Sequence, residues 1–406
     1  MRIDDIFLKI ITDSRKQETL KAAMKSGNIE VNSSVPHGKS TGEKEVYVLD
    51  SHSAVRRFEM IKDKIINVEF SSLKEFDNYL LRLDETENKS NLGGNLILVL
   101  SQTFCRLGAK SEGLELWQYL EKKLTIPEQR KTPYFLFNLI NGGKHAAYGP
   151  KIQEYMIVPQ IDDPKFSLEV AQIFFTGLKE YFKKEYGENK FGDEGGLLIP
   201  DDDYEKPLKI LNQIKKELNL EDKVKFSLDI AASSFYDKEK RVYLLEKDKS
   251  FSKEKLEQIY KNLVSEYDVL SIEDPFEEND WESFQKLTAE VGDKTTIIGD
   301  DLTVTNPELV KKAVEMKTIT GVIIKPTQIG TVSETLKTID LANRYNLKVI
   351  ISHRSAETDD YFISDLAWAS KAWALKAGAP NQEERMVKYN RLIKIYEENK
   401  VMQYNV

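Results

Sequence analysis

The sequence contains little cysteine and no long apolar run, and each absence excludes a class of protein. Cys105 is the single cysteine among 406 residues, so the chain cannot form an internal disulfide. It lies in an apolar stretch, residues 96–107, which favours a buried thiol over a reactive one. No uninterrupted apolar run approaches the ~20 residues that a membrane-spanning helix needs. These absences favour a reducing compartment and no membrane association.

Two further absences concern the N-terminal residues and the charge. The first residues include Asp4 and Asp5 and lack the apolar segment of a signal peptide, so we expect a cytoplasmic protein. The formal net charge is −8, and there is no basic surplus of the kind that nucleic-acid binding requires, so we expect no nucleic-acid partner. An acidic protein that binds an anionic substrate must build a local positive pocket against its own field.

The length and the pattern along the chain indicate two domains. A chain of 406 residues exceeds one ordinary core. Residues 1–127 mix strand and helix patterns, which predicts a smaller α+β domain, with a turn-rich loop at residues 36–42 and Pro127 in the linker. In residues 128–406, short apolar runs alternate with longer amphipathic stretches, as in β/α units. Within the first domain we expect strands at 29–35 and 46–49 and helices at 92–107 and 112–122.

Eight apolar runs in the second domain have the length of buried strands. They are residues 134–140, 155–158, 224–230, 269–272, 296–298, 322–324, 349–351 and 372–375. Eight such strands, each followed by a helix pattern, predict a closed β/α barrel. The alternative is an open doubly wound sheet, which normally carries a G-x-G-x-x-G turn that this sequence lacks.

Acidic residues follow three successive runs. Asp229, Glu273 and Asp300 come where their strands end, and the ends of barrel strands share one rim, where barrel enzymes place their chemistry. Three converging carboxylates repel one another and need a cation. An oxygen-only ligand set suits Mg²⁺, and zinc fits less well because no cysteine or paired histidine joins the acids. Any one of these acids alone would be read as a helix cap or surface charge.

Basic residues follow other runs and complete the same rim. Lys325, Lys376 and Arg354 would hold an anionic substrate there. A lysine beside metal ions and another ammonium group has a lowered pKa and can act as a general base. Lys325 is the better placed of the two, because it lies between an apolar run and Pro326 at the end of a buried strand.

Glu154 departs from this pattern because it precedes its apolar run. If that strand runs antiparallel to the others, Glu154 lies on the same rim and beside Glu194. Glu194 is the acid of the segment GDEGG, residues 192–196, whose three glycines allow a tight fold around it. The alternative reading of that segment is a plain turn, and the local motif does not decide between them.

The ordered set of motifs resembles that of the enolase family over nearly the whole chain. The motifs are LD-x-TENKS at 83–90, NGGKHA at 141–146, QEYM at 153–156, GDEGG at 192–196, DIAAS at 229–233, SIEDPF at 271–276, GDDLTVTNP at 299–307, Lys325 with QIG at 328–330, SHRS at 352–355, and Lys376 with GAP at 378–380. The resemblance implies an enolase-type modified TIM barrel with one antiparallel strand, preceded by an α+β capping domain. It also implies a hydro-lyase that reversibly dehydrates 2-phospho-D-glycerate, a small phosphorylated three-carbon acid, to phosphoenolpyruvate in glycolysis and gluconeogenesis.

The resemblance also implies a role for each site residue. Lys325 takes the proton from C2, and Glu194, supported by Glu154, protonates the departing C3 hydroxyl. Two Mg²⁺ ions serve each site, and the second arrives with substrate. The first is held by Asp229, Glu273 and Asp300, and the second by Ser40 in the mobile loop 36–42. The substrate contacts implied are Arg354 and Ser355 at the phosphate, Lys376 at the carboxylate, and His145, Gln153 and His353 nearby.

Several positions depart from the family pattern. His37 and Lys39 add bulk and charge to the mobile loop, and other departures are Lys16-Gln17-Glu18, Ser234, Pro326 with Thr327, and Ala356. Lys21 and Lys394 stand where many members carry an inter-subunit Glu–Arg pair, so we expect a homo-oligomer whose dimer contacts are weakened or rearranged. Two alternatives stay open: a lyase acting on a phosphonate analogue, of the phosphonopyruvate hydratase type, and a non-catalytic paralogue.

Overall fold

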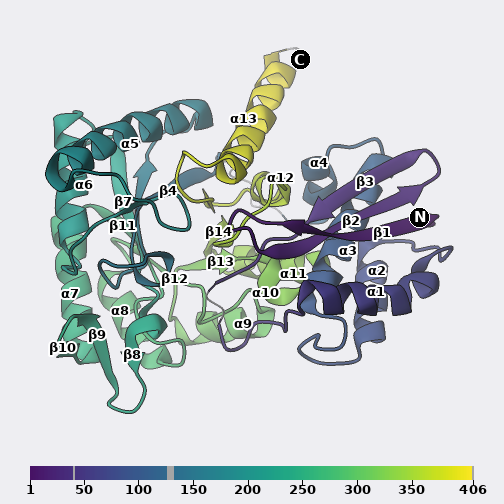
Figure 1. Cartoon of the computed structure of the whole chain (residues 1–406), viewed down its shortest axis with the longest axis horizontal. Coiled ribbons are helices and arrows are strands. Elements are labelled where there is room, and N and C mark those ends of the chain that lie inside the picture. The colour runs from purple at the N-terminus through teal and green to yellow at the C-terminus, as the bar shows by residue number, and fades with distance from the viewer. Residues whose placement is uncertain (40–41, 126–131, 405–406) are drawn as a thin grey trace.

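The computed structural model of the chain describes residues 1–39, 42–125 and 132–404 (Figure 1). The predicted domain boundary at 127/128 and Pro127 lie outside the described residues and stay predictions, and so does the placement of Ser40. Within the described residues, no helix combines the length and apolarity needed to cross a bilayer.

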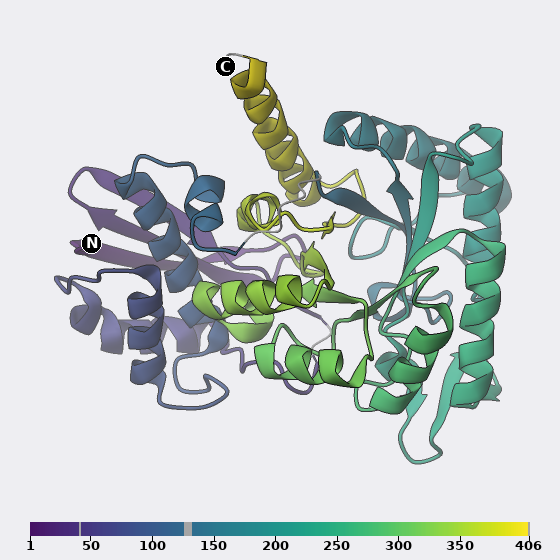
Figure 2. The same cartoon turned by 180° about the vertical axis from the view of Figure 1, so that it is seen from behind.

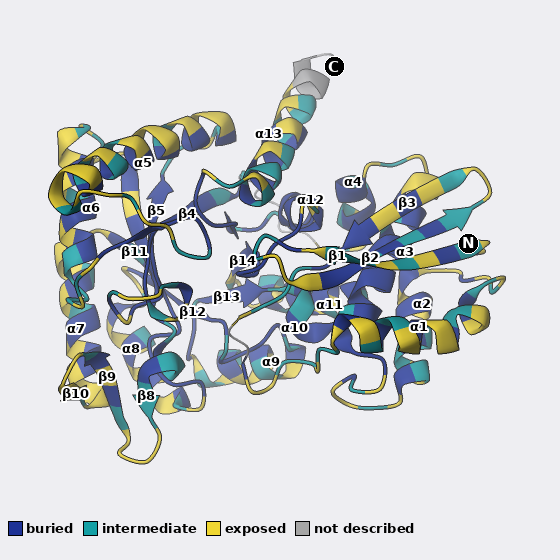
Figure 3. Ribbon diagram, in the orientation of Figure 1, coloured by how far each residue is buried: buried dark blue, intermediate teal, exposed yellow. Residues whose placement is uncertain are grey.

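The N-terminal part of the chain forms an antiparallel sheet packed on helices. The strands β1 (Asp5–Thr12), β2 (Glu18–Ser26) and β3 (Ile29–Ser34) pair in that order. The helices are α1 (Ser51–Ile65), α2 (Leu73–Asp84), α3 (Gly94–Ser111) and α4 (Leu116–Glu121). Helix α3 is buried on nearly all sides because it packs against β2 and β3 and also against the barrel's helices (Figure 3). An apolar stretch on every face is what such a position requires.

Two sequence expectations in this part were wrong. Residues 46–49 do not form a strand, because their backbone groups bond elsewhere: Val46 N–H donates to Gln328 O, and Asn95 bonds both backbone groups of Leu49. The helix expected at 112–122 covers only α4, because Gly113 takes a left-handed φ of +68° and ends the preceding helix.

All eight predicted runs form strands of one closed sheet. The strands are β4 (Tyr134–Asn141), β5 (Glu154–Pro159), β7 (Val224–Asp229), β11 (Val269–Glu273), β12 (Thr296–Gly299), β13 (Gly321–Ile324), β14 (Lys348–Ser352) and β15 (Ala374–Lys376). They are hydrogen-bonded in the order β15-β14-β13-β12-β11-β7-β5-β4, and β15 also pairs with β4, which closes the barrel. Strand β5 runs antiparallel to both of its neighbours, as its sequence predicted. The short β6 (Leu197–Leu198) extends the pairing beside β4.

Helices surround this barrel, and most of them carry exposed residues on the face turned away from it, whereas α12 is buried throughout (Figures 1 and 3). They are α5 (Pro164–Tyr186), α6 (Lys206–Glu217), α7 (Lys253–Glu266), α8 (Trp281–Val291), α9 (Pro307–Met316), α10 (Pro326–Ile329), α11 (Val332–Arg344), α12 (Phe362–Ala369) and α13 (Glu383–Tyr404). A small antiparallel sheet, β8 (Tyr236–Asp237), β9 (Val242–Glu246) and β10 (Lys249–Phe251), follows β7. Helix α5 illustrates the local signals: Asp163 caps its N-terminus, Pro164 is its first residue, and Gly187 ends it with a φ of +80°.

The barrel strands alternate between two cores. Leu136 points to the inner cluster with Met156, Ile298 and Ile350, whereas its neighbours Phe135 and Phe137 belong to the outer core under the helices. This alternation follows from the period of two in a strand. The N-terminal sheet and helices lie beside the barrel, with α11 between them in the view from behind (Figure 2). The interior is thus packed, and chemistry is confined to the rim.

Candidate active site

The carboxyl ends of the barrel strands bring the predicted acids to one rim. Glu273 on β11 is in register with Asp229 on β7, and Asp229 is in register with Glu154 on β5. Glu154 reaches this rim as the first residue of its strand because β5 is reversed. All three side chains are buried, so their charges interact through protein rather than through water.

Lys376 binds these three carboxylates. Its Nζ lies 2.9 Å from Glu273 Oε2, 3.0 Å from Asp229 Oδ2 and 3.3 Å from Glu154 Oε2. Burial alone would lower the pKa of Lys376, but the three carboxylates outweigh burial and hold that pKa well above its ordinary range. Lys376 therefore remains a cation.

Lys325 and Asp300 form a second ion pair on the rim. Lys325 donates to Asp300, whose other oxygen accepts from Gln328 Nε2 at 2.9 Å. Burial lowers the pKa of Lys325, but the carboxylate of Asp300 raises it by a larger amount. The pKa of Lys325 therefore lies above its ordinary value. We expected the opposite direction for a base. A cation bound at Asp300 would withdraw this carboxylate from Lys325 and add a like charge, and both changes lower the pKa.

The donor set at these strand ends fits a hard cation. In the described residues, Glu273 Oε1 is buried without a hydrogen-bond partner. Burial, followed by repulsion from Asp229, raises the pKa of Glu273 well above its ordinary value. A divalent ion would relieve both costs, and all the donors are carboxylate oxygens, which suits Mg²⁺. As they stand, Asp229, Glu273 and Asp300 are bridged by lysine ammonium groups, and they do not form a single compact ligand group.

Two other groups of possible ligands are more compact among the described residues. In each, the ligand atoms lie within 4.8 Å of one another: His145 with Glu154 and Glu194, and Asp274 with Asp300 and Asp301. Asp274 accepts the backbone N–H groups of Asp300 and Asp301, at 2.9 and 2.7 Å, and so fixes the turn that carries Asp300. The group formed by Asp274, Asp300 and Asp301 therefore stabilises the turn at the rim.

The first of these groups contains two carboxyls, those of Glu154 and Glu194, whose pKa values shift in opposite directions. His145 Nδ1 lies 3.4 Å from Glu194 Oε1 and 3.7 Å from Glu154 Oε1. Burial and the charge of Glu194 raise the pKa of Glu154 well above its ordinary value. Burial also raises the pKa of Glu194, but His145, His353 and Arg385 outweigh it and lower the pKa below its usual range. The two directions indicate that Glu154 holds a proton more readily than Glu194 does.

The glycines of residues 192–196 are explained by close contacts. A Cβ at Gly192 would lie 2.7 Å from Asn141 Cβ, and one at Gly196 would lie 2.5 Å from Asn141 Oδ1. Gly195 has a φ of +84°. The segment thus folds tightly against β4, and Asn138 on the same strand donates to Glu194 Oε2 at 3.1 Å. This packing exceeds what a plain turn requires.

The loop before residue 40 lies against the predicted phosphate-binding segment. The backbones of His37 and Ala356 exchange hydrogen bonds of 2.9 and 3.0 Å, and Lys39 N–H donates to Ser355 Oγ at 2.9 Å. A Cβ at Gly38 would lie 1.9 Å from Arg354 Nη2, so any side chain here would displace the guanidinium from its present position. Lys39 Nζ pairs with Asp193 Oδ2 at 2.9 Å, next to Glu194.

Arg354 has a partner that the sequence did not reveal. Its guanidinium binds Glu45, with Nη1 2.9 Å from Oε2 and Nη2 3.3 Å from Oε1, and Nη1 also donates to Thr327 Oγ1 at 2.9 Å. Burial lowers the pKa of Arg354, but Glu45 outweighs it and raises that pKa, so the side chain stays charged. Glu45 thus holds the guanidinium from the side of the loop.

A cavity of about 20 Å³ lies at the centre of these groups. It is lined by Gly38, His145, Gln153, Glu154, Glu194, Asp229, Lys325, Ser352, His353, Arg354, Ser355 and Lys376. Gln153 Nε2 donates to Asp229 Oδ2 at 3.3 Å, and its Oε1 is buried without a partner among residues 1–39, 42–125 and 132–404. Of the predicted residues, Glu273 and Asp300 contact this lining through Lys376 and Lys325, and Ser40 is outside the described residues.

Sequence reasoning assigned no site role to four contributors. Thr327 and Gln328 were noted only as a departure from the family pattern and a motif position, although they lie two and three residues after Lys325 at the end of a barrel strand. Glu45 and Arg385 come from the N-terminal part and from α13. No local pattern distinguishes them from ordinary charged residues.

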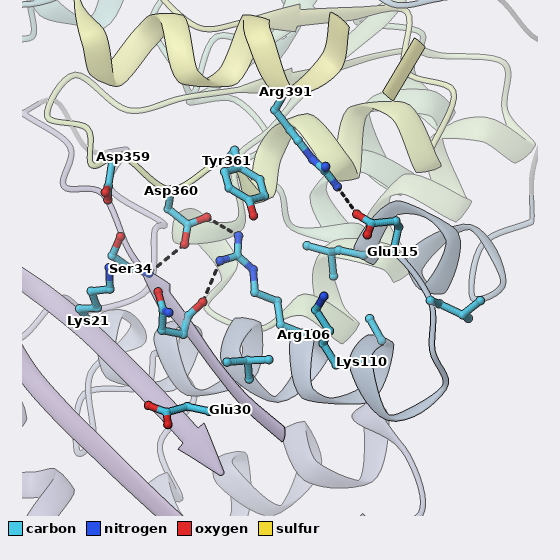
Figure 4. A pocket seen from close by; sticks show the side chains of 15 residues that line it. Lys21, Glu30, Ser34, Arg106, Lys110, Glu115, Asp359, Asp360, Tyr361 and Arg391 are labelled. Carbon is cyan, nitrogen blue, oxygen red and sulfur yellow. Dashed lines mark hydrogen bonds and ion pairs between the residues drawn. The ribbon is translucent and has the colours of Figure 1, made fainter. Parts of the chain in front are cut away.

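A larger cavity, of about 300 Å³, lies between the N-terminal sheet and the barrel (Figure 4). Arg106 crosses it, donating to Asn32 O at 2.8 Å and to Asp360 Oδ1 at 2.6 Å. On the other side Arg391 binds Glu115 at 2.9 Å. The ring of Tyr361 lies between the two guanidiniums, 5.0 and 5.1 Å from their carbons. We call these residues the joint, because their charges are paired across the two parts of the chain.

The joint also bears on the predicted dimer contacts. Lys21 lines its cavity, whereas Lys394 is exposed on α13 and lies 3.8 Å from Glu398. The expectation of a weakened or rearranged dimer stays a prediction.

Comparison with known families assigns both parts of the chain. Residues 3–120 match the family model described as "Enolase, N-terminal domain", and residues 130–405 match "Enolase, C-terminal TIM barrel domain". Among similar curated proteins, the "Enolase" of Elusimicrobium minutum is 37% identical over 98% of this chain and 96% of its own length. The "Enolase" of Thermococcus kodakarensis is 37% identical and "Enolase B" of Dictyostelium discoideum 36% identical, each over 98% of this chain and 95% of its own.

Proposed function

The chain belongs to the enolase family, and from this we propose which of its residues carry out the hydro-lyase reaction, the reversible dehydration of 2-phospho-D-glycerate to phosphoenolpyruvate. Such a reaction needs a base for the proton on C2, an acid for the hydroxyl on C3, and groups that hold a phosphate and a carboxylate. The rim offers each of these.

The observation that carries this proposal is the position of base and acid across the barrel mouth. Lys325 follows β13, and Glu154, which supports the acid Glu194, begins β5, which is four strands away from β13 in either direction around the ring of eight. Both side chains line the same cavity. A substrate held between them would lose its proton to Lys325 on one side and its hydroxyl toward the acid on the other.

The acid is Glu194, supported by Glu154. Their pKa values shift in opposite directions, so Glu154 holds a proton more readily than Glu194, and the pair can exchange a proton with the substrate in either direction of the reaction. His145 Nδ1 lies near an oxygen of each carboxyl, so the imidazole interacts with the charge of Glu154 and with that of Glu194.

The cationic side chains divide between the two ends of the substrate. Arg354 and Ser355 bind the phosphate, because a guanidinium and a hydroxyl beside it are suited to its oxygens. Lys376 lies next to the carboxylate, with Gln153 and His353 on the same lining. Glu45 orients Arg354 from behind and keeps the guanidinium charged.

The family is metal-dependent, and we propose that the resident ion is Mg²⁺. Asp229, Glu273 and Asp300 would hold it, and Ser40 would bind a second Mg²⁺ that arrives with the substrate. The bound ions would supply positive charge to the carboxylate of the substrate as its C2 proton is removed. The orphaned oxygen of Glu273 supports the first of these sites.

Substrate entry requires His37, Gly38 and Lys39 to move away from the site. A cavity of about 20 Å³ holds about one water molecule and no three-carbon phosphate. The contacts of His37, Gly38 and Lys39 with residues 354–356 and Asp193 cover it. The positive charge of Lys39 was one reason to consider a phosphonate substrate. Lys39 pairs with Asp193 in these contacts, so its position gives no support to that alternative. A cytoplasmic location and a homo-oligomer remain predictions from the sequence.

The test is a turnover assay with 2-phosphoglycerate and Mg²⁺, followed by the absorbance of phosphoenolpyruvate. We expect turnover that EDTA abolishes and added Mg²⁺ restores, and Lys325→Ala should lose it. Lys337→Ala, which alters an exposed lysine of α11, should match the unaltered protein. Turnover confined to phosphonate substrates, or ligand binding without turnover, would contradict the proposal and favour the two alternatives respectively.

A further inference from the structure

Arg385 is a buried arginine that the reaction as described does not use. It is the third residue of α13, and its side chain has 0% exposure. In the described residues it forms no ion pair with a carboxylate, although a buried charge is costly unless it is satisfied. Its nitrogens bond instead to neutral groups around the acid and the phosphate-binding segment.

These bonds join two parts of the site. Nη1 donates to Arg354 O and Nη2 to Ser355 O, each at 2.7 Å, and Nη2 lies 3.5 Å from Asp193 O in the glycine segment. Nε lies 3.4 Å from Gln382 Oε1. The same Nη1 faces Nδ1 of His353 within hydrogen-bond distance.

The contact with His353 has one consistent assignment of protons. A guanidinium only donates hydrogen bonds, so Nδ1 of His353 must accept and must carry a lone pair. The proton of the neutral ring is then on Nε2, which lies 3.5 Å from Glu194 Oε1. A protonated imidazolium of His353 would point its Nδ1–H at the guanidinium. The two like charges would repel, and two facing N–H groups cannot form a hydrogen bond.

We propose that Arg385 is a positioning residue that fixes His353 as the neutral tautomer with its proton on Nε2, so that His353 donates toward Glu194. This inference rests on the proposed role of Glu194 as the acid. The charged groups that face His353 are Glu194 from the glycine segment, Arg385 from α13, Lys376 from β15 and Lys325 after β13. Burial lowers the pKa of His353, and the three cations lower it further against the opposing effect of Glu194. This direction agrees with a neutral ring.

The tautomer can be measured without turnover. The chain has four histidines, so long-range ¹H–¹⁵N correlation spectra of ¹⁵N-histidine protein contain four imidazoles, and the signal lost in His353→Gln identifies His353. We expect the Nε2-protonated form in the unaltered protein from pH 6 to 8. A proton on Nδ1, or an imidazolium in that range, would overturn the proposal even if no Arg385 variant folded.

Two variants of Arg385 sharpen the test. Arg385→Met fills the same space without a donor, and we expect His353 to gain the Nδ1 proton or to titrate; Arg385→Lys keeps a charge and a donor and should retain the Nε2 form. The exposed His52, which lies 3.2 Å from Glu18, is the internal control, and its signals should be the same in all three. Circular dichroism and thermal unfolding establish that each variant is folded.

Turnover supplies an independent readout. We expect Arg385→Met to lower kcat about 10-fold or more, and Arg385→Lys to recover part of that loss. A loss of turnover in folded Arg385→Met with an unchanged tautomer would overturn the proposal and leave Arg385 a purely structural role. If the unaltered protein does not turn over 2-phosphoglycerate, but Arg385→Met still changes the tautomer of His353, this inference is supported and the proposed function is contradicted.

Discussion

The rim of the barrel and the joint are both clusters of buried charge, but they differ in how completely their polar atoms are paired. In the joint, Arg106 and Arg391 each have a carboxylate partner, at 2.6 and 2.9 Å. On the rim, Glu273 Oε1 and Gln153 Oε1 are buried and have no hydrogen-bond partner in the part of the chain that the structure describes. A structural cluster satisfies its own groups, whereas a binding site leaves some for a ligand.

The balance of charge shows the same difference. Lys376 alone faces three carboxylates on the rim, and the pKa values of Glu154 and Glu273 rise because burial and their neighbours disfavour a second negative charge. The comparison predicts that changes on the rim alter activity and ligand response, and that changes in the joint alter stability alone.

The largest expected effect is on the acid pair. Glu194→Gln removes the carboxyl that exchanges a proton with the substrate but keeps its size, so kcat should fall by about 10²–10⁴-fold. The unfolding midpoint should change little by comparison. Glu188→Gln, at an exposed residue paired with Lys190, is the control. Nearly full turnover in Glu194→Gln would show that the rim does not depend on this acid.

The joint should respond in stability. Asp360→Asn breaks the ion pair with Arg106, whose side chains are 7% and 13% exposed, and should lower the free energy of unfolding by roughly 3 kcal/mol. Urea unfolding measures this change. Asp359→Asn, at the exposed neighbour on the same cavity, should change it by less than about 0.5 kcal/mol. If folded Asp360→Asn loses turnover, the separation of roles between joint and rim is wrong.

Mg²⁺ should stabilise the protein through the rim. An ion that binds only the folded state adds about 2.7 kcal/mol at a concentration 100 times its Kd, so the thermal midpoint should rise with Mg²⁺. Glu273→Gln should reduce this rise and Glu282→Gln, at an exposed residue of α8, should not. An equal rise in both variants would locate the ion elsewhere.

The smallest expected effect concerns Asp77, where α2 contacts α11. Asp77 accepts from Ser333 N–H at 2.9 Å, but its Oδ1 is buried and no described residue bonds to it. Burial raises the pKa of Asp77 from 3.8 to about 6. Between these values the folded state holds a proton that the unfolded state has lost. Stability should therefore fall, by on the order of 2 kcal/mol, as pH rises from about 4 to 6, and stay level above that.

The control for this pH effect is the amide. Asp77→Asn cannot lose a proton, so its unfolding free energy should vary less over that range, whereas Asp63→Asn, at an exposed residue of α1, should follow the unaltered protein. A pH dependence unchanged in Asp77→Asn would assign the effect to another group.

The barrel could be predicted from the sequence because its signals are local. Each strand is a short apolar run, and the residue after it lies on the rim by geometry alone; even the reversal of β5 could be inferred, from Glu154 preceding its run. The resemblance added roles for these residues.

What the sequence did not reveal depends on tertiary contacts. Glu45 meets Arg354 across 309 positions and Arg385 meets His353 across 32, and neither residue has a local pattern that indicates its partner. The apolar residues 46–49 suggested a strand, but hydrogen bonds to Gln328 and Asn95 occupy their backbone instead. Propensity is a weak guide where such contacts decide.

The seam between β15 and β4 has a consequence for folding. It joins Ala374 to Tyr134, so it closes a chain segment of more than two hundred residues, whereas β4 and β5 meet as sequence neighbours. Closing the longer segment costs more entropy. Lys376 is carried on β15, so a chain whose barrel is still open lacks the ammonium that holds Glu154, Asp229 and Glu273 together. Recovery of activity during refolding therefore reports the closure of the ring, and earlier gains in helix content do not.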